Sequence, residues 1–198
     1  MKKLFLMAIA AFMTVGASAQ LISSNTFTQR ESSNYGRLNL SYQSMDFGGD
    51  DSFSGFGLSW IRGISVSSSS PIFVETGLGM TYAFHSEDDY DLEEKFLSIE
   101  VPVNLTYKWA VTDDINLAPF VGVYFRGNIL GRSEIEDYGD IDWYDDLDAK
   151  RFSFGWNIGL GFEYSSLYLG VSYGADMTEL IEDVDKPSKF SATLGLKF

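Results

Sequence analysis

Strict alternation of apolar and polar residues along eight stretches restricts the possible folds of this chain more than any other feature. In the sixth stretch Phe154, Trp156 and Ile158 share one face, with Gly155 and Asn157 on the other. A period of two is the pattern of a β-strand with one apolar and one polar face. The stretches lie at about 34–46, 54–66, 72–84, 96–109, 115–129, 151–164, 167–177 and 189–198. The sequence therefore predicts an all-β fold.

Such strands build either a soluble β-protein, with apolar faces inside, or a membrane barrel, with apolar faces toward lipid. The polar faces are rich in glycine, which weakens a solvated strand but fits a narrow lumen. Aromatic pairs lie near strand ends, as in Tyr107 and Trp109, where interfacial girdles would lie. The stretches run to about 10–15 residues, which suits the ~9–11 needed for a tilted crossing. We therefore predict an eight-stranded antiparallel up-and-down transmembrane β-barrel over residues 34–198.

The N-terminus has the pattern of a secretory signal. Lys2 and Lys3 precede an apolar stretch that ends at Gly16, and the small residues Ala17 to Ala19 form a cleavage site before Gln20. The alternative, an N-terminal membrane anchor, is disfavoured because the apolar run is shorter than the ~20 residues of a spanning helix. We expect a signal peptide at 1–19 and a short periplasmic segment at 20–33.

Charge is distributed unevenly. Removing Lys2 and Lys3 leaves 12 basic against 28 acidic residues, a net charge of −16. Of these acids, 21 fall in or beside the four connections that follow the odd-numbered stretches. We expect these acidic connections to be extracellular loops and both termini to be periplasmic, because outer-membrane barrels have long outer loops and short inner turns. No basic stripe is present, so nucleic acid is not an expected partner.

The densest acidic run offers carboxylates to a hard cation. Its spacing matches no defined calcium loop, and solvated loops account for it equally well, so the sequence predicts at most a weak cation-binding loop. The residues concerned are Asp140, Asp142, Asp145, Asp146 and Asp148. The chain has no cysteine and only one histidine, His85, which disfavours a zinc site. No cofactor is expected.

Charged residues also occur on the polar faces that would line the lumen. They are Arg37, Glu75, Glu100, Lys108, Arg126, Glu163, Asp176 and Lys197. We expect a network of ion pairs that fills the lumen, because eight strands enclose little more than side-chain space. A path for protons or ions is the alternative. One residue conflicts with this pattern: Arg62 falls on the apolar face, where it would cost ~2–4 kcal/mol at the membrane midplane, so we expect a bulge or a shifted boundary in that strand.

The chain ends immediately after the eighth stretch, in a set of apolar residues like the signal that outer-membrane insertion machinery reads. They are Phe190, Leu194, Leu196 and Phe198, although Thr193 stands where that signal usually has glycine. With this ending, the Ala-Ser-Ala-Gln cleavage site and the Phe/Tyr/Gly-rich strands, the sequence resembles the small outer-membrane β-barrels of the OmpA/OmpX-like "porin family", Bacteroidetes members in particular. The resemblance implies outer-membrane lipid, lipopolysaccharide and the insertion machinery as partners, and a monomer.

Three functions remain open. The first is a non-enzymatic barrel with a structural or surface-interaction role in the cell envelope. The second is a narrow channel for small solutes or ions. The third is a lipid A-modifying enzyme, for which His85, Ser86 and Glu87 lie at a suitable rim. Adjacent strand residues point to opposite faces, which argues against catalysis by His85 and Ser86, so we predict no enzymatic activity.

Overall fold

The computed structural model describes residues 34–47, 52–67, 70–87, 92–135, 139–145, 149–180 and 186–198. The predicted signal peptide at 1–19 and the segment at 20–33 lie outside these ranges. The strands are β1 (Tyr35–Asp46), β2 (Ser52–Ser65), β3 (Ile72–Glu87), β4 (Leu92–Tyr107), β5 (Trp109–Ala110), β6 (Ile115–Ile135), β7 (Gly139–Asp142), β8 (Phe152–Tyr164), β9 (Leu167–Asp176) and β10 (Ser188–Lys197). None of the described segments forms an apolar helix of membrane-spanning length.

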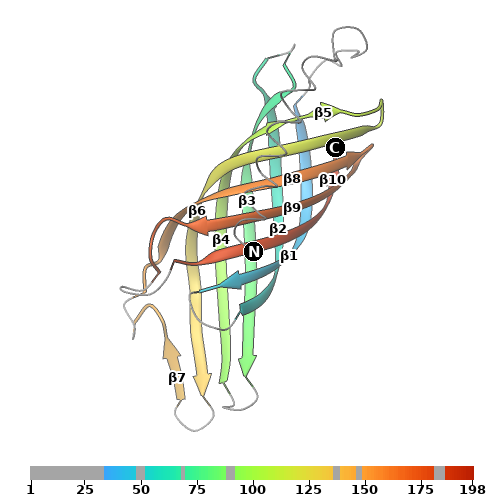
Figure 1. Cartoon of the computed structure of the whole chain (residues 1–198). Coiled ribbons are helices and arrows are strands. Elements are labelled where there is room, and N and C mark those ends of the chain that lie inside the picture. The colour runs from blue at the N-terminus through green and yellow to red at the C-terminus, as the bar shows by residue number, and fades with distance from the viewer. Residues whose placement is uncertain are drawn as a thin grey trace, which may run out of the picture. The chain divides into compact units, whose positions relative to one another are not determined.

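The eight long strands form a closed ring in which each strand is antiparallel to its neighbours (Figure 1). The order is β1, β2, β3, β4, β6, β8, β9, β10, and β10 pairs β1 from Arg37↔Lys197 to Asp46↔Ser188. Closure pairs the backbone groups of every one of these strands on both sides, which a lipid environment demands. The predicted eight-stranded up-and-down barrel is confirmed. The two short strands, β5 and β7, are additions that the sequence did not predict.

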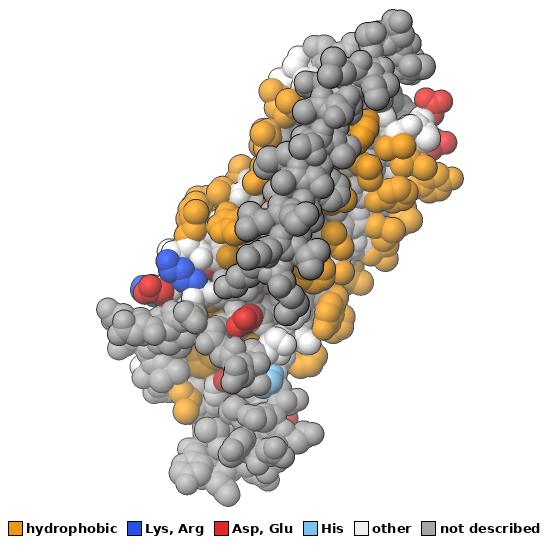
Figure 2. All heavy atoms as spheres, viewed as in Figure 1, with side chains coloured by type: hydrophobic (Ala, Val, Ile, Leu, Met, Phe, Trp, Pro, Cys, Tyr) orange, Lys and Arg blue, Asp and Glu red, His pale blue; other side chains and the backbone are white. Residues whose placement is uncertain are grey.

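Large apolar side chains cover the outer wall of the barrel. Phe56 is 56% exposed and Leu196 is 60% exposed, and Figure 2 shows hydrophobic side chains along the wall in this view. Tyr82 and Phe84 lie near one end of the wall, and Tyr107 near the other. A wall of this kind is unfavourable in water and suits acyl chains between two aromatic girdles.

The inner face explains why the polar sides of the strands are rich in glycine. The ring of Tyr168 lies over Gly161 and Gly170, and a Cβ added at Gly170 would lie only 2.6 Å from the Tyr168 hydroxyl. Tyr124 covers Gly155 in the same way. The narrow lumen therefore accommodates each large ring by pairing it with neighbours that have no side chain.

The two ends of the barrel differ. We call the end with Tyr35, Phe198 and the short turns the terminal end, and the opposite end the loop end. At the loop end the sheet of β3, β4, β6 and β7 continues past the other strands (bottom of Figure 1); β6 has 21 residues and β9 has 10. We call residues 85–87, 92–95, 130–135 and 139–142 the loop-end extension.

For residues 85–87, 92–95, 130–135 and 139–142, the structure corrects the expectation that 85–95 and 130–150 are loops; residues 88–91, 136–138 and 146–148 lie outside the described ranges. These strands pair with one another, as in Lys95↔Arg132 and Arg132↔Asp142, so their backbone hydrogen bonds are made within the sheet. Both faces of the extension carry charges, which removes the alternation by which the other strands could be recognised.

The expected bulge in β2 is wrong. Pairing is continuous from Tyr35↔Gly63 to Asp46↔Ser52 on one side and from Ser54↔Phe84 to Ser65↔Phe73 on the other. Ile61 is buried inside and Arg62 is exposed on the outer wall. The register shift occurs instead between β4 and β6, where Leu97 pairs Leu130 but Ser98 pairs Asn128. The extra residue brings Gly131 and Ser133 to the inner side.

Candidate functional site

The predicted luminal charges separate into two clusters. At the terminal end, Lys108 Nζ and Lys197 Nζ donate to the two carboxylate oxygens of Glu163 at 2.7 and 2.9 Å. Arg37 donates through both terminal nitrogens to Glu75, each at 3.2 Å. We call these five residues the terminal-end cluster. Because two carboxylates face three cations, the cluster carries one positive charge in excess.

Cation–π contacts with aromatic rings stabilise that excess positive charge. Lys108 Nζ lies 3.4 Å from the ring centroid of Tyr35, and the guanidinium of Arg37 lies 3.7 Å from that of Tyr168. Such contacts are stronger where water is excluded. The Tyr35 hydroxyl also donates to Glu75. The cluster therefore closes the terminal half of the lumen with paired charges and aromatic rings.

The second group, the loop-side cluster, lies nearer the loop end. Arg126 pairs with Asp176, which also accepts a 2.5 Å hydrogen bond from the Tyr124 hydroxyl. Glu100 pairs with Lys189. All eight residues predicted to line the lumen are thus in ion pairs, and Lys189 joins them. It alternates in phase with Ser191 and Thr193, so its inner position could have been inferred, but it stood at the predicted strand boundary.

A polar cavity of about 120 Å³ lies between the clusters. Its lining includes Asn39, Ser41, Gln43, Thr81, Asn104 and Asn157. The side-chain oxygens of Asn39, Asn104 and Asn157 are buried without a hydrogen-bond partner in the described part of the chain. A cavity this polar and roomy can hold several waters, which would satisfy such oxygens.

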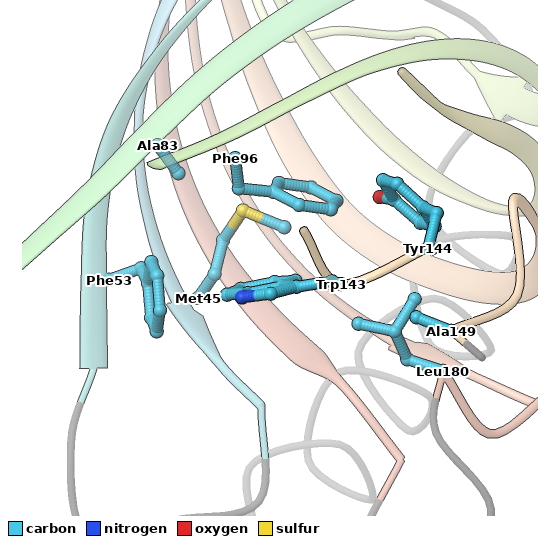
Figure 3. Close-up of a cluster of buried hydrophobic side chains, with 8 residues drawn as sticks. All are labelled: Met45, Phe53, Ala83, Phe96, Trp143, Tyr144, Ala149 and Leu180. Atoms are coloured by element: carbon cyan, nitrogen blue, oxygen red, sulfur yellow. The ribbon is translucent and has the colours of Figure 1, made fainter. Parts of the chain in front are cut away.

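Aromatic and aliphatic side chains close the lumen at the loop end (Figure 3). This aromatic plug consists of Met45, Phe53, Ala83, Phe96, Trp143, Tyr144, Ala149 and Leu180. Trp143 lies at its centre: it stacks on Phe96 with ring centroids 6.1 Å apart, and Phe47 packs edge-on against it at 5.9 Å. The connection between β6 and β8 therefore folds back into the barrel mouth.

Trp143 is held by hydrogen bonds as well as by packing. Its ring nitrogen donates to the Ser133 hydroxyl at 2.8 Å, and its backbone nitrogen donates to the Gly131 carbonyl at 2.9 Å. A Cβ at Gly131 would lie 2.6 Å from the Trp143 ring, so this approach needs glycine. Burial beside it raises the pKa of Tyr144 to about 12. The sequence signal for the plug was a Trp-Tyr pair inside an otherwise acidic run.

The loop-end extension carries its own ion pairs. Lys95 Nζ lies 2.8 Å from a Glu134 oxygen and 3.1 Å from one of Glu93. The hydrogen bond from Lys95 lowers the pKa of Glu134. By sequence, the extension contains six acidic residues and two basic ones, Lys95 and Arg132. The acidic residues are Glu87, Glu93, Glu94, Glu134, Asp140 and Asp142.

The predicted cation-binding loop is only partly described. Asp142 accepts a hydrogen bond from the Tyr144 backbone at 2.9 Å, and Asp145 lies 3.5 Å from Arg151. Asp146, Asp148 and the Asp140 side chain lie outside the description. Where side chains are described, no three potential metal ligands come together.

The remaining predicted residues lie at opposite ends. His85 lies on the inner side of β3, its ring 5.4 Å from that of Phe53, while the Ser86 and Glu87 side chains lie outside the description. Phe190, Leu194, Leu196 and Phe198 are all exposed on the outer wall, along β10 from near its loop end to the residue after it at the terminal end. They form a continuous apolar stripe, and recognition of that stripe by insertion machinery stays a prediction.

Comparisons with known proteins agree with this architecture. Residues 6–198 match the profile of the outer membrane protein beta-barrel domain family. Comparison with curated proteins gave no match. Among solved structures, the outer membrane enzyme PagL is similar, with a TM-score of 0.56 and 14% identity over 81% of this chain and 98% of that one.

Two further structures are similar to the same extent. Neisserial surface protein A has a TM-score of 0.52 and 16% identity over 84% of this chain and 98% of its own. The attachment invasion locus protein Ail of Yersinia pestis has a TM-score of 0.51 and 13% identity over 83% of this chain and 97% of its own. At these identities the likeness extends to the fold and no further.

Proposed function

Since this chain belongs to the outer membrane protein beta-barrel domain family, we propose that its mature form is a non-enzymatic surface protein of the bacterial outer membrane. Its loop end faces the outside of the cell and its termini face the periplasm. It works as a monomer, in contact with phospholipid and lipopolysaccharide, after delivery by the barrel insertion machinery.

The observation that carries this proposal is the loop-end extension. A strand needs about 9–11 residues to cross the membrane, and β6 has 21, so its last six residues, 130–135, can stand clear of the lipid. Pairing with β4, and over 132–135 with β7, holds them in an ordered sheet. Among the side chains that the structure describes there, four acids (Glu93, Glu94, Glu134 and Asp142) outnumber two bases, so the sheet presents a negative surface to partners that carry positive charge.

The filled lumen supports a structural role. Ion pairs occupy both luminal clusters, and the aromatic plug covers the loop end. The charged groups of the lumen form ion pairs with one another across the barrel, and these pairs hold the wall strands together.

Orientation is tested by epitope tags in intact cells. One tag is inserted between β6 and β7, and its matched control is inserted in the tight turn Ser165–Ser166 between β8 and β9. We expect antibody to label the first tag on intact cells and the second only after the outer membrane is permeabilised. The reverse pattern would overturn the proposed orientation.

Partner binding is tested with poly-L-lysine as the probe and the refolded barrel in nanodiscs, which expose both ends. We expect Glu93→Gln with Glu134→Gln to weaken binding several-fold, because both acids belong to the loop-end extension. The control, Asp113→Asn with Asp114→Asn, removes the same charge from an exposed turn at the terminal end. Equal weakening by both pairs would show that net charge alone attracts the probe and would refute a dedicated acidic surface.

The polar cavity favours a second candidate, a narrow channel for small solutes or ions. The cavity provides about 120 Å³ of free space within the lumen. Both clusters and the plug would have to move for a solute to pass through the barrel. Planar-bilayer recordings distinguish the two functions: we expect no discrete conductance steps. Regular steps from the purified barrel would favour the channel.

Lipid A modification is the third candidate, because PagL, called an outer membrane enzyme, shares the fold. The His85 ring packs beside Phe53, a residue of the aromatic plug, which places it inside the barrel mouth and away from the lipid-facing wall. Mass spectrometry of lipid A from cells that overproduce the protein tests this reading. We expect unchanged lipid A; a modification that disappears in His85→Ala would establish an enzyme.

A further inference from the structure

Arg62 is the one residue of β2 whose place on the outer wall conflicts with an apolar surrounding. It lies between Trp60 and Ile64, which are 48% and 42% exposed on the same face. Within the described residues, other charges on outward strand positions occur only at the loop end; they are Asp46, Glu93, Lys95, Arg132, Glu134 and Asp142. No ion pair of Arg62 is found in the same residues. A group from the membrane can therefore serve as its countercharge.

The neighbours of Arg62 across the sheet are Gly36 on β1 and Thr76 on β3. Directly paired side chains on one face lie about 4.5–5.5 Å apart, which brings the Thr76 hydroxyl next to the arginine. On the other side, the Phe198 ring covers Gly36. The surroundings of Arg62 are thus polar toward Thr76 and aromatic toward Phe198.

Arg62 lies within reach of the lipid headgroup level. Arg62 lies three residues from the last residue of β2, Ser65. At about 3.3 Å per residue and a strand tilt of about 40°, this is roughly 8 Å inside the terminal end. An arginine at that depth can extend along the wall until its guanidinium reaches the interface.

We propose that Arg62 and Thr76 bind the phosphate of one glycerophospholipid in the periplasmic leaflet. The guanidinium fork matches two phosphate oxygens, the Thr76 hydroxyl donates to a third, and the acyl chains lie along Trp60 and the neighbouring apolar wall. The bound phosphate supplies the countercharge that Arg62 does not find among the described residues. The inference rests on the proposed orientation, which places the terminal end in the phospholipid leaflet.

Native mass spectrometry of the refolded mature chain tests the site, with phosphatidylglycerol as the probe lipid. We expect Arg62→Gln to lower the retained lipid about fivefold, which corresponds to the ~1 kcal/mol that one cation contributes at an anionic lipid surface. Arg62→Lys should retain an intermediate amount because it keeps the charge but loses the fork. Thr76→Val should lose part of the binding.

The matched control is Arg151→Gln, the same change at an exposed arginine paired with Asp145 outside the barrel wall; lipid retention should stay at the wild-type level. Equal retention by Arg62→Gln and wild type would overturn the proposal. Competition of phosphatidylglycerol by lipid A at equal concentration would overturn the assignment to the periplasmic leaflet. Epitope labelling reports orientation independently, so loss of lipid binding and failure of the proposed function remain distinguishable.

Discussion

Glu163 is the residue at which the interior of the barrel can be tested most sharply. Its side chain is fully buried, and each carboxylate oxygen accepts a hydrogen bond from a different lysine, Lys108 and Lys197. Glu163→Gln preserves the shape but leaves two ammonium groups without their countercharge. Removing one partner of a buried pair costs about 3–5 kcal/mol. We expect the lower part of that range, about 3 kcal/mol, because the Lys197 side chain is 23% exposed at the terminal end and water can reach it.

Reversible urea unfolding in phospholipid vesicles, followed by tryptophan fluorescence, measures this loss. Asp145→Asn serves as the control, because that carboxylate is exposed and its contact with Arg151 is 3.5 Å long; stability should not change. Adding Lys108→Met to Glu163→Gln should restore part of the loss by removing one uncompensated cation. A loss below about 1 kcal/mol for Glu163→Gln would refute the reasoning, since it would mean that water already screens the cluster.

Two further predictions concern the aromatic plug. Gly131→Ala should destabilise the barrel by about 1–3 kcal/mol, because the new Cβ would lie 2.6 Å from the Trp143 ring. Urea unfolding measures this loss. An unfolding midpoint equal to that of the wild type would show that the ring is not held there. Alkaline titration by ultraviolet absorbance, with Tyr144→Phe as the reference, should show Tyr144 ionising near pH 12. Since its pKa is raised in the folded state, its contribution to stability is complete below about pH 10 and is lost as pH rises through about 12; ionisation near pH 10 would contradict its burial.

The wall and the lumen could be predicted from the sequence because a period of two assigns every strand residue to a face. That rule placed Arg37, Glu163 and Asp176 inside and Leu58 and Trp60 outside. It could not tell which charges pair, because ion pairs such as Arg37 with Glu75 join strands whose relative stagger depends on closure of the ring. For Arg62 the rule was right, because the side chain does lie on the outer wall. The expected bulge was wrong, because it was inferred from the cost of an arginine at the membrane midplane, whereas Arg62 lies near the terminal end.

The loop end was beyond the reach of the same rule. Alternation vanishes where both faces of a strand carry polar or charged residues, so the rule assigns the extended parts of β3, β4 and β6 to loops. The plug depends on contacts between residues far apart in the sequence, such as Trp143 with Phe47 and Phe96. Only the tertiary fold brings these together, and a Trp-Tyr pair in an acidic segment gave the single hint.

The central claim is that the apolar faces of these strands contact acyl chains and their polar faces enclose the lumen. Its most direct test is fluorescence quenching by lipids brominated on their acyl chains, in refolded variants that keep one tryptophan each. Trp60 on the outer wall should be quenched strongly, and Trp143, which is 6% exposed inside the plug, should be quenched little. Equal quenching of both, or strong quenching of Trp143 with Trp60 unaffected, would contradict the account.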